Sequence, residues 1–311
     1  AAAPTFEILL AARALTGAFG GTLGALVLAI VGDVVPYERR GAAMGQIMTA
    51  FSAASIAGVP AGIYLAGHFG LSAPFLTVGS VSAVGLLLAW YVLPPLRSHL
   101  QRDASGQHFH ASPAQVIRTV SQDGNQRLAL LFTLVLMLGH FTIIPFIAPY
   151  MQLNIGMTNN QVGLLYAIGG TVTVICLPLF GKLSDRYGHV LIFSLASVAA
   201  LASIFTITNL PPVGLVLALV ASSSFFLVAS GRSVPATTMV TSVVKPENRG
   251  SFMSIRQSVN EAGLALSSFV AGLLIVEQPD GRLGDYHLVG YFAIGMSILA
   301  MFLARRLRMV D

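Results

Sequence analysis

Charged side chains and cysteine are both scarce in this chain of 311 residues. Asp, Glu, Lys and Arg together make up 9% of it, against about 25% in ordinary soluble domains. A soluble fold of this size needs more polar surface than that. The single cysteine, Cys176, excludes an intrachain disulfide framework and a cysteine-based metal site. These absences argue against the soluble and the disulfide-stabilised classes of protein.

The signatures of several enzyme classes are missing as well. The sequence contains no H-E-x-x-H, no G-x-S-x-G and no G-x-x-x-x-G-K-[ST], which mark zinc proteases, serine hydrolases and phosphate-binding loops. We therefore expect that the chain is not an enzyme and does not hydrolyse ATP. We also expect no cofactor and no metal ion.

Apolar residues, which make up 55% of the chain, gather in long runs. Windows of about 20 apolar residues predict membrane-spanning helices. The fold class that follows is an all-α integral membrane protein, a multi-span helical bundle. Nine spans are expected, at residues 6–32, 43–67, 71–93, 126–153, 160–184, 189–209, 212–240, 249–276 and 286–308.

One connection, residues 94–125, is long and basic, and it divides the chain into a three-span part (1–93) and a six-span part (126–311). Its segment SPAQVIRTVSQD predicts a short surface helix that begins at Pro113. If the helices alternate, nearly all loop Lys and Arg lie on the side of this linker. We expect a multi-pass protein of the cell membrane. The positive-inside rule then places the linker and the C-terminus on the cytoplasmic side, and residue 1 on the outer side. The net charge of +5 thus reflects topology, and no nucleic-acid partner is expected.

Two turns repeat each other at a distance of 209 residues. PYERRGAAMG and PENRGSFMS align Arg40 and Gly41 with Arg249 and Gly250. Parallel repeats of this kind are a recurrent plan of secondary transporters. The spans at 126–209 have no counterparts under this shift, so we expect a truncated chain that lacks about three spans of roughly 30 residues each with their loops. The alternative is a genuine nine-helix protein.

The loop GKLSDRYGHV, residues 181–190, carries Gly181, Asp185, Arg186 and Gly188 in a G-x-x-x-D-R-x-G arrangement. It resembles the short cytoplasmic loop of the major facilitator superfamily. The resemblance implies two pseudo-repeated halves, with this chain as helices four to twelve of twelve. It also implies that this loop and the turns at Arg40, Gly41, Arg249 and Gly250 gate a conformational change. The alternative is a charge cluster that only sets topology.

Two further stretches resemble the family, and the first is RALTGAFGG, which carries Arg13, Gly17 and Gly21. It is similar to the family's fourth helix, where the arginine takes part in proton transfer. Arg13 is therefore a coupling candidate, although Thr16 stands where the family commonly has glutamine. The alternative is an arginine that snorkels to the membrane surface.

The second stretch, AGVPAGIYLAGHFG, places Gly58, Pro60 and Gly62 in one helix. It resembles the antiporter motif of the family's fifth helix, in the arabinose-efflux and drug-efflux branch, with Val59 between the glycine and the proline. Pro60 should bend the helix, and small residues should let a neighbouring helix approach closely. Ordinary helix packing requires the same small residues and is the alternative.

Glu261 is an acidic residue inside a predicted membrane span. Twelve residues after Arg249, it lies about 18 Å along its helix, near the middle of the bilayer. Gln257 lies three residues before Asn260 and four before Glu261, spacings at which we expect the three side chains to share a face. Such a polar face should line a central cavity, with Glu261 as proton site or substrate counter-charge and the amides as hydrogen-bonding groups. The alternative is a structural acid paired with Arg232 or Arg256.

His140 and Arg232 are the other candidates for the substrate and proton pathway. His140 precedes Pro145 and Pro149, which predict a broken outer half of its helix. A hydrogen-bonded structural histidine is the alternative. Tyr150, Gln152 and Asn154 are expected to be anchors at the membrane surface.

The function predicted from the sequence is secondary active transport by alternating access. The favoured form is proton-coupled efflux of a small drug-like or sugar-like solute. The expected partners are the solute, protons and the lipid bilayer, and the protein is expected to be a monomer. The alternatives are uptake of a small metabolite and a non-transporting sensor or scaffold derived from a transporter. A channel is disfavoured because the sequence offers no repeated carbonyl filter and no charged ring.

Overall fold

The computed structural model describes residues 5–17, 19–20, 54–92, 113–244 and 249–309. The chain divides into two compact units. The first comprises residues 1–50 and 61–116, and the second comprises residues 51–60 and 117–311. The long loop 93–112 and the turn that contains Arg40 and Gly41 lie outside the described residues, so the expectations for them stay predictions.

The first unit contributes apolar helices. Residues 6–17 are helical, and so are α3 (Val59–Phe69), which begins in the segment of the second unit, and α4 (Ser72–Val92). Gly70 joins α3 to α4 with a φ of +85°, a conformation that glycine adopts without steric cost. In α4 no residue is buried, as expected for a helix whose apolar side chains face lipid.

The helix that contains Pro60 begins irregularly. Residues Ala54–Gly58 form a π-helical turn, η2, and α3 follows directly at Val59. Proline lacks the N–H that would continue the hydrogen-bond ladder, which explains why regular α-geometry starts only next to Pro60. The bend predicted at Pro60 stays a prediction; the irregular turn that the structure describes lies directly before it.

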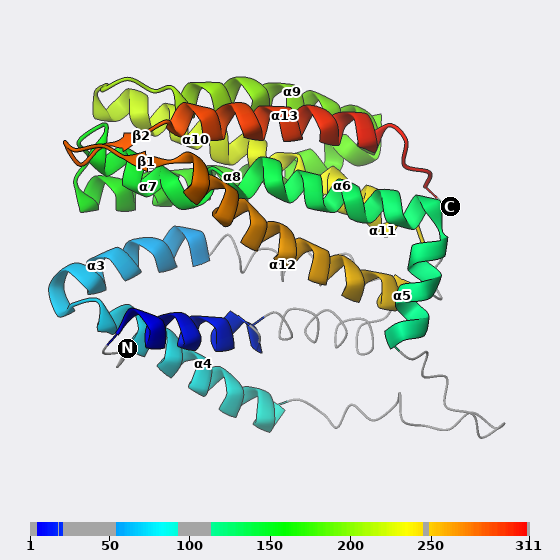
Figure 1. Cartoon of the computed structure of the whole chain (residues 1–311), viewed down its shortest axis with the longest axis horizontal. Helices are drawn as coiled ribbons and strands as arrows, with labels where there is room; N and C mark the ends of the chain where they lie inside the picture. The colour runs from blue at the N-terminus through cyan, green and yellow to red at the C-terminus, as the bar shows by residue number, and fades with distance from the viewer. Residues whose placement is uncertain (1–4, 18, 21–53, 93–112, 245–248, 310–311) are drawn as a thin grey trace. The chain divides into compact units, whose positions relative to one another are not determined.

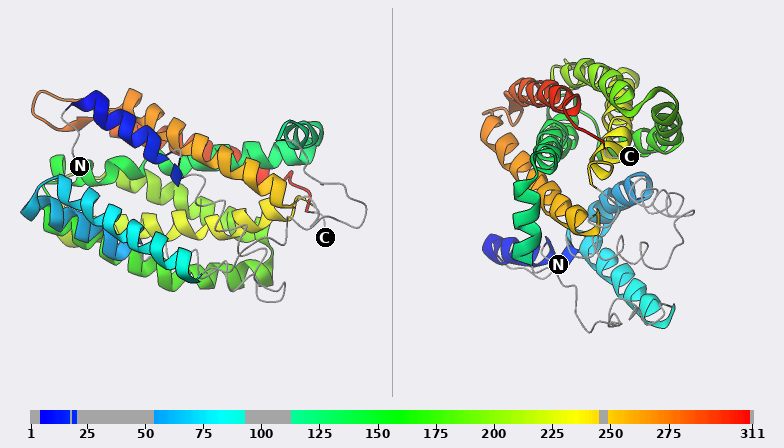
Figure 2. Two further views of the ribbon diagram at one scale, coloured as in Figure 1. Left: turned by 90° about the horizontal axis from the view of Figure 1, so that it is seen from below. Right: turned by 90° about the vertical axis from the view of Figure 1, so that its right-hand side faces the viewer.

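The second unit is the helical bundle drawn from green to red in Figures 1 and 2. Its helices are α6 (Gly124–Phe141), α7 (Ile144–Leu153), α8 (Asn159–Tyr187), α9 (His189–Thr208), α10 (Leu215–Gly231), α11 (Ser233–Thr241), α12 (Arg249–Leu274) and α13 (Tyr286–Ala304). The short helix α5 (Pro113–Gln122) precedes them and begins at the predicted proline. Two short antiparallel strands, β1 (Val276–Glu277) and β2 (Leu283–Gly284), join α12 to α13.

Among the described residues, six helical segments are long and apolar enough to cross a membrane. They agree with six of the nine predicted spans and are Ser72–Val92, Gly124–Leu153, Asn159–Tyr187, His189–Thr208, Leu215–Thr241 and Tyr286–Ala304. The helix predicted at 249–276 is present as α12, which has 26 residues but carries Arg256 and Glu261. The spans predicted at 6–32 and 43–67 lie partly outside the described residues.

Two spans of the second unit are interrupted. The first breaks between α6 and α7, where Pro145 stands in the first turn of α7, and this confirms the break predicted from Pro145 and Pro149. The second breaks at Arg232, between α10 and α11, where the sequence predicted one continuous helix. Pro235 explains the second break, because its nitrogen cannot donate to the carbonyl of Gly231.

Small residues bring the helices of the second unit close together. A Cβ added to Gly263 of α12 would lie 2.7 Å from the Cβ of Met137 on α6. A Cβ added to Gly139 of α6 would lie 3.1 Å from Ser297 Oγ on α13. The helices α12 and α13 thus both pack against α6 with their backbones close, as small residues permit in membranes.

Two asparagine side chains bind backbone segments at opposite ends of the α6–α7 pair. The amide of Asn125 donates to the Arg308 carbonyl and accepts from the Arg308 N–H, at 2.7 and 3.0 Å. The amide of Asn154 makes the same pair of bonds with Leu283, at 2.9 and 3.0 Å. Because Leu283 precedes α13 and Arg308 follows it, both ends of α13 are tied to the α6–α7 pair.

Candidate functional site

Glu261 lies near the middle of α12 and its side chain is exposed. Gln257, one turn earlier, donates from Nε2 to Glu261 Oε1 at 2.7 Å, which agrees with the predicted shared face. Asn260 is half-buried beside them. The arrangement joins one carboxyl group, which can bind and release a proton, to an amide that can hydrogen-bond a solute.

The opposite side of α12 is the packing side. At 100° per residue, Gly263 lies roughly 200° around the helix from Glu261. Gly263 contacts Met137, and Ser267 donates its hydroxyl to the Met137 carbonyl at 3.1 Å. Packing against α6 therefore turns Gln257 and Glu261 away from the interior of the second unit.

Arg232 occupies the break between α10 and α11 and is fully buried. Its Nη1 donates to Ser297 Oγ on α13 at 2.8 Å, and its Nη2 donates to the Gly139 carbonyl on α6 at 3.2 Å. Its Nε has no hydrogen-bond partner. The guanidinium thus joins three helices through neutral acceptors only.

The expected alternative, an ion pair between Glu261 and a basic residue, is absent from the described residues. Glu261 forms no salt bridge with Arg232 or Arg256 there. Arg256 instead donates from Nη2 to Thr237 Oγ1 on α11 at 3.4 Å, and its Nε has no partner. The acid and the two arginines therefore occupy separate environments.

His140 is buried in α6, next to Gly139, whose carbonyl accepts from Arg232. Its ring lies 4.9 Å from that of Phe141 and 6.3 Å from that of Phe225, measured between centroids. The structure thus brings His140 near Arg232 and places both inside the bundle. It does not bring either of them to the exposed Gln257–Glu261 pair.

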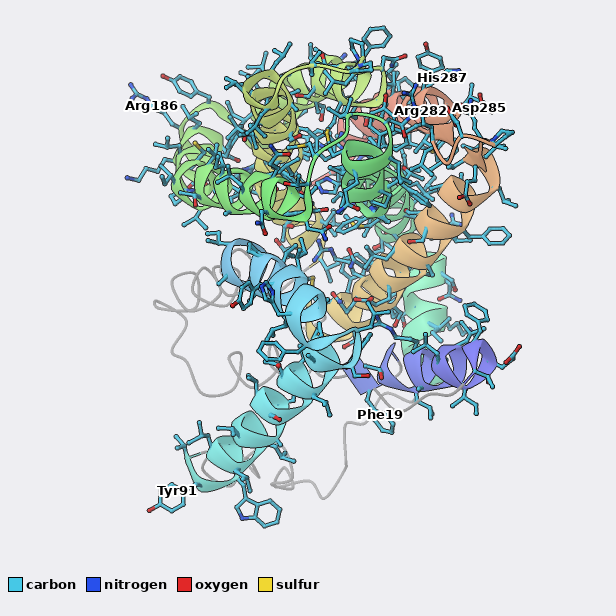
Figure 3. The ribbon with its side chains drawn as sticks, turned by 90° about the vertical axis from the view of Figure 1, so that its left-hand side faces the viewer. Phe19, Tyr91, Arg186, Arg282, Asp285 and His287 are labelled. Atoms are coloured by element: carbon cyan, nitrogen blue, oxygen red, sulfur yellow. The ribbon has the colours of Figure 1, made fainter. Side chains whose placement is uncertain are left out.

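The GKLSDRYGHV loop is a one-residue connection between α8 and α9. Gly188 ends α8 with a φ of +93°, which favours glycine. The hydroxyl of Ser184 and Nδ1 of His189 are hydrogen-bonded across this turn. Arg186 projects outward (Figure 3) with its guanidinium carbon 5.3 Å from the Tyr187 ring centroid. Within the described ranges, neither Asp185 nor Arg186 forms a salt bridge, so their gating role stays a prediction.

The candidates of the first three spans are only partly described. Arg13 is exposed, and its guanidinium carbon lies 4.9 Å from the ring centroid of Phe75. A Cβ added to Gly17, Gly58 or Gly62 would meet no atom within 4 Å, so close helix packing at these positions stays a prediction. Gly21, Arg40 and Gly41 lie outside the described residues, and so do the side chains of Arg249 and Gly250 at the start of α12.

Pro60 does touch a neighbouring helix of the second unit. A Cβ added to Gly163 of α8 would lie 3.8 Å from Pro60 Cβ, and one added to Gly170 would lie 2.6 Å from Ile56 Cγ1. The small residues at this contact belong to α8, whereas the sequence pattern pointed to the glycines around Pro60. Ile56 of η2 and Pro60 of α3 therefore pack against the glycines of α8.

The expected anchors at the end of α7 are corrected by the structure. Tyr150 is buried, and its hydroxyl donates to the Leu210 carbonyl at 2.9 Å. Asn154 binds the backbone of Leu283. Gln152 donates to Asn159 Oδ1 at 2.7 Å. Tyr150 and Asn154 are thus tied within the bundle, because the hairpin β1–β2 and the end of α9 cover this helix end.

Sequence reasoning missed Ser297 and Gly139 as partners of Arg232. A serine in the apolar run of α13 and a glycine in that of α6 are weak signals, since both residue types are common in membrane helices for packing alone. Within the described ranges, no group of three or more His, Cys, Asp or Glu side chains is placed to hold a metal ion.

Comparison with known proteins decides the family. The sequence pattern of the Major Facilitator Superfamily matches residues 1–138 and 129–311, which together cover the whole chain. The chain belongs to the major facilitator superfamily.

Similar proteins of this superfamily are named as transporters. An uncharacterized MFS-type transporter, YwfA of Bacillus subtilis, is 26% identical over 297 residues, which are 94% of this chain and 68% of YwfA. A multi-drug resistance efflux pump PmrA homolog of Lactococcus lactis is 28% identical over 60% of this chain and 45% of its own length. The multidrug resistance protein MdtG of Salmonella arizonae is 29% identical over 57% of this chain and 43% of MdtG.

A solved structure supports the fold. A variant of the Escherichia coli fucose:proton symporter FucP aligns with a TM-score of 0.52 at 14% identity, covering 95% of this chain and 83% of FucP. The predicted all-α membrane bundle of the major facilitator type is therefore confirmed. This member of the superfamily is a multi-pass membrane protein whose relatives are transporters and not enzymes.

Proposed function

We propose that this superfamily member is a proton-coupled efflux transporter of small solutes, and that Glu261 is its proton-exchanging group. The observation that carries the proposal is the exposed Gln257–Glu261 pair in the middle of α12. Ionisable groups at membrane depth are costly and mark substrate or ion pathways. A buried hydrogen-bond partner would indicate that Glu261 has a structural role. Its carboxyl group is instead bonded to the amide of Gln257 on the same helix.

The orientation of α12 supports the same role. The side of α12 that carries Gly263 and Ser267 packs against α6. The Gln257–Glu261 pair on the opposite side must therefore face either lipid or an aqueous path. A carboxyl group in contact with lipid hydrocarbon is strongly disfavoured. An aqueous path between two bundle halves at the midplane is where transporters of this plan bind solute and coupling ion.

Efflux is favoured by two independent observations. Among the similar proteins, the PmrA homolog and MdtG are named for multidrug resistance. The π-helical turn η2 directly before Pro60 supports our proposal that this segment acts like the antiporter motif it resembles. The proposed membrane orientation, with the linker and C-terminus in the cytoplasm, follows from the distribution of Lys and Arg.

Arg232 and His140 have a supporting part in this proposal. Arg232 is fully buried and bound to neutral acceptors on α6 and α13, so it holds the two broken spans in register. Conformational change in such proteins needs rigid groups of helices that move as units. The arginine supplies that rigidity without taking up the proton.

Transport by a Glu261→Gln variant tests the proposal. The full-length protein, expressed in cells, should drive ethidium efflux under an imposed proton gradient, and Glu261→Gln should abolish the dependence on that gradient while membrane insertion stays normal. Glu277→Gln is the matched control, because Glu277 is an exposed carboxyl in the hairpin strand β1. Unaltered proton-driven transport by Glu261→Gln would remove Glu261 from the mechanism.

The same assay separates the alternatives. Accumulation of solute inside the cells, driven by protons entering with it, would replace efflux with uptake. Failure of the unaltered full-length protein to move any solute under a proton gradient would favour a sensor or scaffold.

A further inference from the structure

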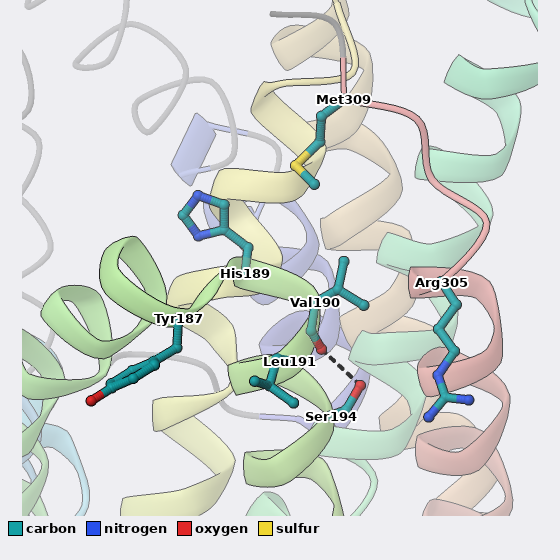
Figure 4. A pocket seen from close by; sticks show the side chains of 8 residues that line it. Tyr187, His189, Val190, Leu191, Ser194, Arg305 and Met309 are labelled. Carbon is teal, nitrogen blue, oxygen red and sulfur yellow. Dashed lines mark hydrogen bonds between the residues drawn. The ribbon is translucent and has the colours of Figure 1, made fainter.

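A surface hollow of about 450 Å³ lies where α8 ends, α9 begins and α13 ends. Its lining includes His189, Leu191 and Ser194 of α9, and Arg305 and Met309 after α13. In Figure 4, Arg305 comes from the end of α13 and faces Ser194 of α9, while His189 and Met309 stand toward the far rim. No function discussed above uses this hollow.

The charge of the hollow is cationic. Arg305 is an exposed arginine and forms no salt bridge within the described residues. Ser194 uses its hydroxyl to donate to the Val190 carbonyl at 2.7 Å. No Asp or Glu belongs to the lining. A guanidinium above an otherwise mostly apolar surface attracts an anionic group, and its planar donors suit phosphate in particular.

An apolar strip leads away from the hollow along the same two helices. On α9 the exposed side chains are Leu191, Leu195 and Val198, which are 51%, 58% and 57% exposed. On α13 Phe302 and Leu299 are 53% and 39% exposed. Because α9 and α13 pack against each other, these side chains extend the hollow toward the middle of both helices.

The position of the hollow matches the boundary of a membrane. Both α9 (His189–Thr208) and α13 (Tyr286–Ala304) are long and apolar enough to span it, and the hollow lies at their ends. Lys182 and Arg186, with Asp185 between them, belong to the same turn, and Arg306 and Arg308 belong to the same chain end. Basic pockets between membrane helices at this level bind anionic lipid headgroups.

We propose that this hollow is a binding site for an anionic phospholipid, with the lipid phosphate on Arg305 and an acyl chain along Leu195, Val198 and Phe302. A free phosphate ion would use the guanidinium but not the apolar strip. The combination of one cation with a long apolar surface therefore favours a lipid. The bound lipid would join the α8–α9 turn to the end of α13.

The test is lipid binding by the purified 311-residue chain in a neutral detergent. Native mass spectrometry counts bound phosphatidylglycerol against phosphatidylcholine during a titration. The unaltered chain should prefer phosphatidylglycerol, and Arg305→Gln should weaken that binding about fivefold, as expected for one basic residue at a membrane surface. Arg282→Gln is the matched control, because Arg282 is an exposed arginine in the hairpin before α13 and does not line the hollow. It should change binding less than about twofold.

A second variant tests the hollow without changing charge. Ser194→Trp should fill the space opposite Arg305 and weaken phosphatidylglycerol binding, while the chain still elutes as a single species. Equal losses in Arg305→Gln and Arg282→Gln would overturn the proposal, because general surface charge would then explain binding. Unchanged binding in Ser194→Trp would overturn it as well. Complete displacement of the lipid by inorganic phosphate would show a free-anion site instead.

Discussion

Arg232 and Glu261 are both charged residues inside a predicted span, yet their surroundings differ in every respect. Arg232 is fully buried where α10 gives way to α11 and donates to Ser297 and to the Gly139 carbonyl. Glu261 is exposed on the uninterrupted α12 and accepts only from Gln257 among its described neighbours. One charge is held by three helices, and the other belongs to a single helix.

The difference teaches how a membrane bundle uses charge. A buried guanidinium with several donors can link helices through neutral acceptors, so its removal should affect stability. An exposed carboxyl at membrane depth links nothing, so its removal should affect function. Each of the following substitutions tests one side of this contrast.

The largest effect on stability is expected from Arg232→Ala. Truncation of the buried side chain leaves a cavity and deprives Ser297 and Gly139 of their donors, which together should cost about 3–5 kcal/mol. Arg232→Met fills most of the volume and should cost clearly less. Thermal unfolding in detergent, followed by circular dichroism, measures both. Equal losses in the two variants would assign the effect to hydrogen bonding and not to the cavity.

A smaller loss is expected from Gly263→Ala on the packing side of α12. The new Cβ would lie 2.7 Å from Met137 Cβ, and such overpacking costs about 1–3 kcal/mol. Gly272→Ala in the same helix is the control, since a Cβ there meets no atom within 4 Å. The same unfolding measurement compares them. If Gly272→Ala proved the more destabilising, the assigned packing side of α12 would be wrong.

Ser297→Ala should cost about 1 kcal/mol, because it removes the acceptor of Arg232 Nη1 and leaves a buried donor without its partner. Ser297→Thr, which keeps the hydroxyl, should retain more of the stability. The stability of both variants is compared in the background of Arg232→Met, where the difference should disappear. A difference that persisted there would mean that the serine acts without the arginine.

The smallest effect on stability is expected from Gln257→Ala. Its bond to Glu261 is exposed, and exposed side-chain hydrogen bonds contribute less than about 0.5 kcal/mol.

The accessibility of positions 261 and 297 to water gives a more direct test of the contrast. In a Cys176→Ser background, Glu261→Cys should react with a membrane-impermeant thiol reagent, whereas Ser297→Cys should stay unmodified because Ser297 is buried. Modification at 297 but not at 261 would reverse the comparison.

Several features of the fold follow from local sequence and were predicted. Apolar runs predicted all six membrane spans found among the described residues, because length and hydropathy are properties of a single segment. Pro145 predicted the break between α6 and α7, and Pro113 predicted the start of α5. The break at Arg232 was missed although Pro235 follows it, since transmembrane helices often accommodate proline without ending.

Of the candidate site, the sequence predicted the contacts within α12 but not the contacts between helices. Spacing placed Gln257 and Glu261 on one face, and the hydrogen bond between them agrees. The alternative pairing of Glu261 with Arg232 or Arg256 concerned contacts between helices, and the described residues contain no such pair. The anchor role of Tyr150 failed for the same reason, because its partner Leu210 lies 60 residues further along the chain.

The sequence by itself determined the class of this protein, six of its spans, its family motif and the position of Glu261 along α12. Each of these depends on composition or on spacing within one helix, where rise and turn per residue are constant. Only the tertiary structure decided which charges are buried, that Ser297 and Gly139 hold Arg232, and that a hollow forms beside Arg305. These depend on how each helix is rotated against its neighbours, and close contacts at residues such as Gly139 and Gly263 set that rotation.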